Sequence, residues 1–166
     1  INGVEFINNA IEQGAIAVIW DAEQGVDAIE INWRKTTGNI EVPVIAIANL
    51  TQIIGELADR FYKHPSEHLS VCGVTGTNGK TTTTHIIKTI LENAGKRTAV
   101  LGTIGAYIDG EIFEQKLTTP DPMDFHYLLK RISDKNCEYV IMETSAHALY
   151  LKKHEPVKFI SGLFPN

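Results

Sequence analysis

The feature that most constrains this chain is a glycine-rich loop between an apolar strand and a helix, at residues 71–81. The segment reads Val-Cys-Gly-Val-Thr-Gly-Thr-Asn-Gly-Lys-Thr, and an amphipathic helix is predicted directly after it. Glycines allow positive φ angles and a close approach of the backbone, while the first turn of a helix offers unpaired N–H groups to an anion. A strand, a glycine-rich loop and a helix in this order predict an α/β fold with a phosphate-binding loop.

The end of this loop carries side chains suited to nucleotide phosphates. Lys80 is placed to reach the β- and γ-phosphates, and the Thr81 hydroxyl is placed to bind Mg²⁺. The match to the pattern GxxxxGK[ST] is imperfect, because Val74 stands where the first glycine belongs and Gly73 is displaced by one. The residues expected to hold the nucleotide are Gly76, Thr77, Asn78, Gly79, Lys80, Thr81 and Thr82.

The hydropathy pattern after residue 68 predicts strands that alternate with helices. Strands of this kind form a mostly parallel sheet that is covered on both faces. The predicted strands are 69–74, 97–101, 139–142 reaching Glu143, and a further strand over 157–163. The predicted helices are 81–93, which ends at Gly95, and 125–135. A hairpin over 105–114 is expected to turn at Asp109-Gly110, and residues 118–124 are expected to form a turn.

The first part of the chain is less regular. A helix over 4–13, strands over 15–20 and 42–48 and a helix over 51–63 are predicted, with a polar, weakly patterned stretch over 21–41. Thr51 is the expected N-cap of the second helix, and its apolar face is expected to carry Ile53, Ile54, Leu57, Ala58 and Phe61. Because Pro65 stops this helix, a domain boundary is predicted at residues 64–68.

Composition limits the class of protein. The 166 residues are 43% hydrophobic and 21% charged, which predicts a packed globular protein with one core or two small ones. A net charge of -5 without a basic run argues against nucleic-acid binding, and no apolar stretch is long enough for a membrane span. Cys72 and Cys137 lie far apart and favour a reduced, cytoplasmic setting, with neither expected to be catalytic.

The string over residues 75–83 resembles the ATP-binding loop of the Mur ligases and their folylpolyglutamate and cyanophycin synthetase relatives. This variant loop accounts for Val74. Three further strings, over 102–105, 117–121 and 142–149, resemble the branch of the family that adds the third residue of the peptidoglycan stem peptide.

The resemblance implies an organisation in two parts. Residues 1–67 would be the C-terminal part of an α/β UDP-substrate-binding domain. Residues 68–166 would be the N-terminal part of a mostly parallel, P-loop central ATPase domain.

The same resemblance implies ATP-dependent amide formation. The terminal carboxylate of a UDP-N-acetylmuramoyl dipeptide would take a phosphoryl group from ATP, and an amino acid such as lysine or diaminopimelate would then attack the acyl phosphate. Lys80 and Glu143 would be catalytic, and Thr81 with Glu143 would hold Mg²⁺. From the residues alone, Glu143 could equally be a solvated or capping carboxylate at a strand end.

The resemblance also implies substrate contacts for four residues, namely Thr118, Thr119, Ser145 and Lys153. Lys153 stands where the family usually has an arginine, so a bidentate contact would become a point charge. Hydroxyl groups at turns often bind the local backbone, and that alternative stays open. His147 would lie near nucleotide or substrate, or would be an orienting or packed side chain.

The two ends of the sequence raise a further expectation. Residue 1 is Ile, and the chain stops at Asn166 after an apolar run. In the family, a metal-binding histidine, a carbamylated lysine and a third domain follow this point. We therefore expect an internal portion of a ligase that binds ATP but is not competent alone.

Two alternatives accompany the ligase interpretation. One is a related synthetase for cyanophycin or folylpolyglutamate. The other is a non-catalytic nucleotide-binding module, suggested by three departures from the family pattern at Ala146, Lys153 and Pro165.

Overall fold

The computed structural model describes residues 3–22, 30–35, 40–114, 118–151 and 153–165. The chain divides into two compact units, one ending at Ile53 and the other beginning at Ile54. The division falls within helix α2 (Leu50–Phe61), earlier than the boundary expected from Pro65. A helix therefore carries the chain from one unit into the next.

The first unit is a small sheet with one helix packed against it. Strand β3 lies in the middle of the order β1-β3-β2, with β1 parallel to it and β2 antiparallel. Ile7 and Ile11 of the helix form an apolar cluster with Val42 and Val44 of β3. The elements are the 3₁₀ helix η1 (Gly3–Phe6), α1 (Ile7–Glu12), β1 (Val18–Ala22), β2 (Glu30–Lys35) and β3 (Glu41–Ala48).

Strand β2 lies within the polar, weakly patterned stretch over 21–41, for which no element was predicted. It lies at the edge of the sheet, and its Trp33 is 62% exposed, so the sequence carries little of the buried alternation that marks a strand. The strand predicted over 15–20 begins and ends later, at Val18 and Ala22. Pro43 fits within β3 because β1 pairs only from Val44 onward.

The start of α2 differs from the sequence prediction. Thr51 is not the N-cap, since Leu50 is already helical and its N–H donates to the Asp21 carboxylate at 3.2 Å. A carboxylate brought from β1 by the fold thus takes the capping role. The placement of Phe61 on the apolar face is also wrong, because this side chain is 72% exposed.

Near its end, α2 buries an acidic residue instead. Asp59 is 5% exposed, and its Oδ2 lies 2.6 Å from Nδ1 of His64. Its Oδ1 lies 3.3 Å from Nδ1 of His126, a fully buried residue. Two imidazoles therefore contact the Asp59 carboxylate, whose burial without polar partners would be costly.

The second unit is built on a six-stranded sheet of order β7-β6-β5-β8-β4-β9. The strands β5, β8, β4 and β9 are parallel, and the β6-β7 hairpin is attached antiparallel to β5. The elements are η2 (Pro65–His68), β4 (Ser70–Val74), α3 (Lys80–Asn93), β5 (Thr98–Gly102), β6 (Gly105–Ile108), β7 (Glu111–Phe113), α4 (Pro122–Asp134), β8 (Tyr139–Glu143), α5 (Ala146–Tyr150) and β9 (Phe159–Leu163).

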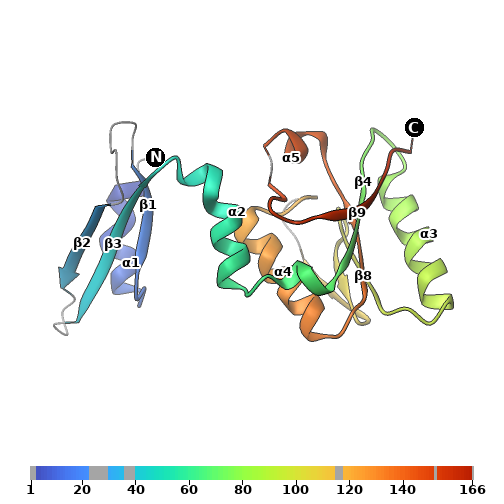
Figure 1. Ribbon diagram of the computed structural model, residues 1–166, viewed down its shortest axis with the longest axis horizontal. Coiled ribbons are helices and arrows are strands. Elements are labelled where there is room, and N and C mark those ends of the chain that lie inside the picture. The colour runs from blue at the N-terminus through green and yellow to red at the C-terminus, as the bar shows by residue number, and fades with distance from the viewer. Residues whose placement is uncertain (1–2, 23–29, 36–39, 115–117, 152, 166) are drawn as a thin grey trace. The chain divides into compact units, whose positions relative to one another are not determined.

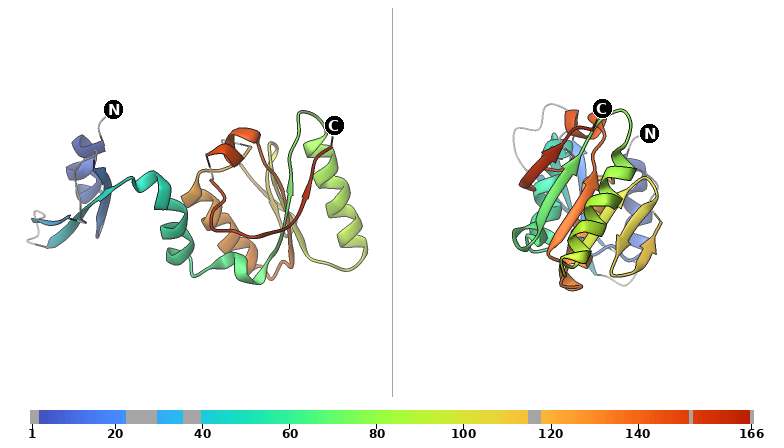
Figure 2. Two further views of the ribbon diagram at one scale, coloured as in Figure 1. Left: turned by 45° about the horizontal axis from the view of Figure 1, so that its top comes forward. Right: turned by 90° about the vertical axis from the view of Figure 1, so that its right-hand side faces the viewer.

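Helices cover both faces of this sheet, with α3 on one side and α4 on the other (Figures 1 and 2). Successive strand residues go to opposite faces: Val100 and Ile141 join the cluster with α3, while Leu101 and Val140 join the cluster with α4. Strands buried on both faces are typical of parallel sheets. The predicted α/β class and the doubly covered, mostly parallel sheet are therefore confirmed.

Most element predictions in this unit are confirmed with small shifts. The hairpin turns at Asp109 (φ 52°) and Gly110 (φ 83°), and Gly95 (φ 76°) follows the end of α3. Helix α4 begins earlier than expected, with Pro122 in its first turn, and the short α5 was not predicted. Strand β9 starts at Phe159, two residues later than expected.

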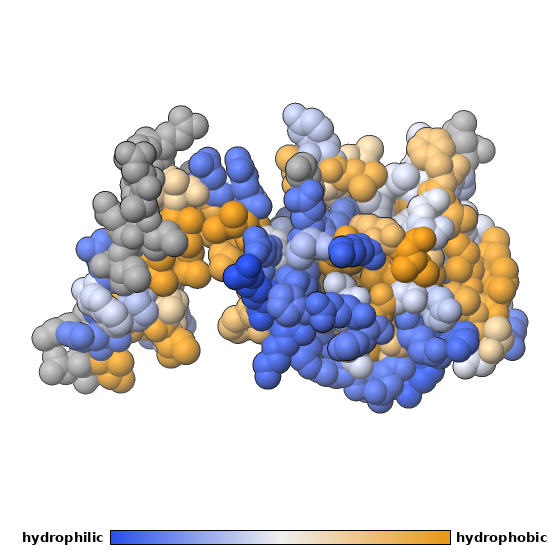
Figure 3. Space-filling view, viewed as in Figure 1, coloured by the Kyte–Doolittle hydropathy of each residue, from blue (hydrophilic) through white to orange (hydrophobic). Residues whose placement is uncertain are grey.

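Apolar surface gathers over α3 in the second unit (Figure 3), where Ile86 and Ile90 are 55% and 61% exposed. Within the part of the chain that the structure describes, no helix has the length and apolar character needed to cross a membrane.

Candidate functional site

The loop between β4 and α3 has the backbone form that the sequence predicted. Gly76 (φ 140°) and Gly79 (φ 79°) both lie at positive φ, and Gly79 is the N-cap of α3. A Cβ at Gly76 would come within 2.5 Å of the Pro165 carbonyl oxygen, so only glycine fits there. The N–H of Thr75 donates to the Leu163 carbonyl at 2.9 Å, which ties the loop to the end of β9.

Lys80 is held against this loop. Its Nζ donates to the carbonyl oxygen of Gly76 at 2.8 Å and lies 3.4 Å from that of Thr77. The ammonium group thus stands beside the N-terminus of α3, where helix dipole and positive charge both favour an anion. The side chains of Thr77, Asn78 and Thr82 are exposed around it.

Glu143 lies at the carboxyl end of β8 and faces α3. It is 1% exposed, so it is not a solvated carboxylate, and its Oε1 accepts a hydrogen bond from the Thr81 hydroxyl at 2.9 Å. The fold thus brings together Thr81, expected from the loop motif to bind Mg²⁺, and Glu143, for which the resemblance implied the same role. Ligands of open α/β sheets bind at this end of the strands.

Two residues without an expected role complete the surroundings of Glu143. Thr103 donates to it twice, from the backbone N–H to Oε1 at 3.2 Å and from the hydroxyl to Oε2 at 3.0 Å. A Cβ at Gly102 would lie 2.3 Å from Oε1, so glycine makes room for the carboxylate. Gly102 is the last residue of β5, the neighbour of β8, and Thr103 directly follows it; this position at a strand end was the signal that could have identified them.

The predicted substrate residues fall into different settings. The Thr118 hydroxyl is 3.2 Å from that of Thr103 and so belongs to the Glu143 network. Thr119 is buried, its hydroxyl lying 3.4 Å from the Glu143 carbonyl oxygen while accepting from the Ser145 N–H at 3.2 Å. The Ser145 oxygen caps α5 by accepting from the Ala148 N–H at 3.1 Å.

Lys153 and His147 have no described bond to this network. Lys153 forms an ion pair with Asp121 at 2.5 Å, and the His147 side chain is exposed rather than packed. Burial raises the pKa of the Cys72 and Cys137 thiols, as expected of structural cysteines.

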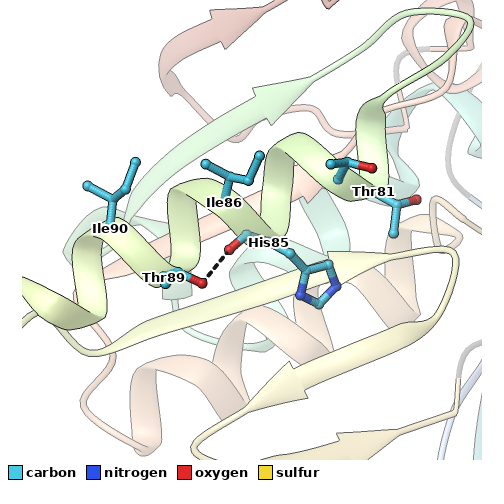
Figure 4. Close-up of a pocket in the computed structure, with 6 residues that line it drawn as sticks. Thr81, His85, Ile86, Thr89 and Ile90 are labelled. Carbon is cyan, nitrogen blue, oxygen red and sulfur yellow. Dashed lines mark hydrogen bonds between the residues drawn. The ribbon is translucent and has the colours of Figure 1, made fainter.

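A shallow hollow of about 410 Å³ runs from the loop along the outer face of α3 (Figure 4). Thr81 lies at its start, and the exposed Ile86 and Ile90 side chains lie farther along the helix. The lining residues are Thr81, Thr82, His85, Ile86, Thr89 and Ile90. The hollow is thus a feature of one helix face.

The oxygen atoms at this site fit Mg²⁺. This ion takes oxygen ligands at about 2.0–2.1 Å in octahedral geometry, which puts neighbouring ligand oxygens about 2.9 Å apart. Thr81 Oγ1 and Glu143 Oε1 lie 2.9 Å apart because the hydroxyl donates to the carboxylate, so an ion held by both oxygens would replace that hydrogen bond. The described residues contain no cluster of three or more His, Cys, Asp or Glu side chains that could hold a metal. Mg²⁺ is commonly bound by one or two protein groups together with substrate phosphates and water.

A glycine-rich loop between a strand and a helix, with Lys80 at the start of that helix and a buried carboxylate facing it, is the arrangement of a P-loop domain of the α/β class. Residues 74–166 match the model of the Mur ligase middle domain. The chain belongs to the Mur ligase family.

Similar proteins are described as UDP-N-acetylmuramoyl-L-alanyl-D-glutamate--2,6-diaminopimelate ligases. The one from Alkaliphilus metalliredigens is 36% identical over 99% of this chain and 31% of its own length. The one from Clostridium tetani is 38% identical over 99% of this chain and 32% of its own length. A solved structure of such a ligase superposes with a TM-score of 0.73 at 25% identity, covering 96% of this chain and 30% of that chain.

The chain spans about a third of the length of the curated relatives it matches.

Proposed function

We propose that this chain binds Mg·ATP and takes part in the amide ligation that adds the third residue of the peptidoglycan stem peptide. The contact between Thr81 and Glu143, directly behind the glycine-rich loop, carries this proposal. These two oxygen groups would hold the metal, and Lys80, the residue before Thr81, would bind the phosphates.

The residues support the first half of such a reaction. Loop N–H groups and Lys80 would bind the phosphates and stabilise the charge that develops on the leaving oxygens. Thr81 and Glu143 would hold Mg²⁺, which supplies additional positive charge at the phosphates when bound. The γ-phosphoryl group would pass to a substrate carboxylate, and an amine would then displace phosphate as the amide forms.

The substrates are proposed from the relatives. A UDP-N-acetylmuramoyl dipeptide would accept the phosphoryl group, and diaminopimelate, as in the relatives' name, or lysine would supply the amine. Residues 1–67 would be the C-terminal part of the UDP-substrate-binding domain and residues 68–166 the N-terminal part of the ATP-binding domain. Thr118, Thr119, Ser145 and Lys153 would contact the substrate. ATP and a UDP-linked substrate imply a cytoplasmic reaction.

Calorimetric titration of the chain with ATP, with and without Mg²⁺, tests the nucleotide site. We expect binding that strengthens with Mg²⁺. No heat of binding under either condition would overturn the proposal.

A thermal shift assay with the UDP-muramoyl dipeptide tests the substrate. Protection by this dipeptide is expected, whereas protection by a folate or by cyanophycin would favour the related synthetases. If the chain binds ATP but none of these three ligands protects it, the result would support the non-catalytic nucleotide-binding module.

A further inference from the structure

Thr103 lies in the turn after β5 and has no role in the function proposed above. Its side chain is exposed, yet it binds the nearly inaccessible Glu143 carboxylate through both of its donors. The N–H takes Oε1 and the hydroxyl takes Oε2, so the two bonds fix the plane of the carboxylate. Thr81 binds only Oε1 and cannot do this alone.

The direction of the next hydrogen bond follows from proton count. A threonine hydroxyl has one proton and two acceptor lone pairs, whereas a carboxylate oxygen only accepts. The Thr103 proton therefore points to Glu143 Oε2, at 3.0 Å. In the contact of 3.2 Å between Thr103 and Thr118, Thr118 must then be the donor.

We propose that Thr103 is a positioning residue that orients Glu143 for a divalent cation and makes Thr118 present only acceptor lone pairs to a substrate. The inference rests on the proposed Mg·ATP site. Thr118 would consequently select a substrate group that donates a hydrogen bond, an amide N–H or a hydroxyl.

The proposal predicts a specific loss when the Thr103 hydroxyl is removed. The Thr103→Val variant keeps the shape and the backbone N–H but frees Oε2, so the carboxylate can rotate away from the metal. Because a hydrogen bond to a charged group is strong, we expect Mg²⁺ to strengthen ATP binding about tenfold less than in the unmodified chain. ATP affinity measured in EDTA should not change.

Calorimetry with ATP in EDTA and in Mg²⁺ gives, for each variant, the ratio of the two ATP affinities. Thr103→Ser should restore it, since the hydroxyl returns. Thr89→Val is the matched control, because this hydroxyl donates to the His85 carbonyl on α3, away from Glu143. Thr103→Ala, which also lacks the hydroxyl, serves if the valine variant does not fold by circular dichroism.

A double-mutant cycle tests the link to Thr118. Thr118→Val should lower the Mg²⁺ effect in the unmodified chain and cause no further loss in Thr103→Val, because it acts through that hydroxyl. A folded Thr103→Val or Thr103→Ala variant with an unchanged Mg²⁺ effect would overturn the inference, as would additive losses in the cycle. Absence of ATP binding by the unmodified chain would instead overturn the proposed function.

Discussion

The hydroxyl oxygen of Thr81 lies 2.9 Å from the carboxylate Oε1 of Glu143, although 62 positions separate the two residues in the chain. The sheet order creates this contact, because β4 and β8 are adjacent parallel strands whose carboxyl ends meet at one edge. The loop after β4 delivers Thr81 on the first turn of α3, and β8 ends on Glu143.

Replacement of Lys80 by alanine should abolish measurable ATP binding. The ammonium group that lies at the loop would be lost, and the loop N–H groups alone would face the phosphate charge. Calorimetry measures the effect. Lys96→Ala is a suitable control, since it removes an equal charge from an exposed pair with Glu138 beyond the other end of α3. Equal ATP affinity in both variants would contradict the assignment of the loop.

Glu143→Gln should retain the fold and lose the effect of Mg²⁺ on ATP binding. The amide oxygen can still accept from Thr81 and from the Thr103 N–H, while the negative charge that attracts a cation is gone. Titrations with and without Mg²⁺ should then give similar affinities. A preserved Mg²⁺ effect would show that the metal is held elsewhere.

Gly102→Ala should disturb the same carboxylate by steric pressure. The added Cβ would lie 2.3 Å from Oε1 and 2.8 Å from Cδ of Glu143, so the side chain must move. We expect a loss of about 1–3 kcal/mol in unfolding free energy, measured in urea, together with a weaker Mg²⁺ effect.

Gly162→Ala is the matched control for this substitution. A Cβ at Gly162 meets nothing within 4 Å, so stability should stay within about 0.5 kcal/mol of the unmodified chain. Equal effects of the two substitutions would argue against close packing at Gly102.

Acid should weaken the second unit through His154. Burial, with a smaller contribution from Lys153, lowers the pKa of this imidazole to about 4. Between pH 6.5 and 4 the His154 imidazole binds a proton in the unfolded chain but stays neutral in the folded chain, so stability falls as pH falls. Above pH 6.5 this residue contributes no pH dependence. The full loss is about 3 kcal/mol.

Urea unfolding at pH 7 and pH 4.5 measures most of this loss, which is complete only below pH 4. His154→Phe should reduce it, because the ring contacts with Phe125 and Phe159 at 5.5 and 5.7 Å can persist without a titrating group. His147→Gln, at an exposed position, should leave it unchanged. An equal acid sensitivity in all three proteins would exclude His154 as the cause.

Local sequence signals predicted most elements of the second unit, and they were weaker in the first unit. The hairpin at Asp109-Gly110 and the end of α3 at Gly95 were predicted because glycine, and to a lesser degree aspartate, adopts positive φ angles more readily than other residues. Strand β2 and the cap of α2 were missed because each depends on a partner distant in sequence. β2 pairs with β3, and the cap is Asp21 of β1.

The sequence by itself determined the glycine-rich loop, the alternation of strands and helices and the positions at which the strands end, since these follow from backbone preference and the periodicity of apolar residues. Only the tertiary structure decided which side chains meet at that edge. It placed Thr103 and Gly102 against Glu143, and it buried the Thr119 hydroxyl while leaving Thr118 in the network. The reason is that these contacts depend on sheet order and register, which join residues far apart in the chain.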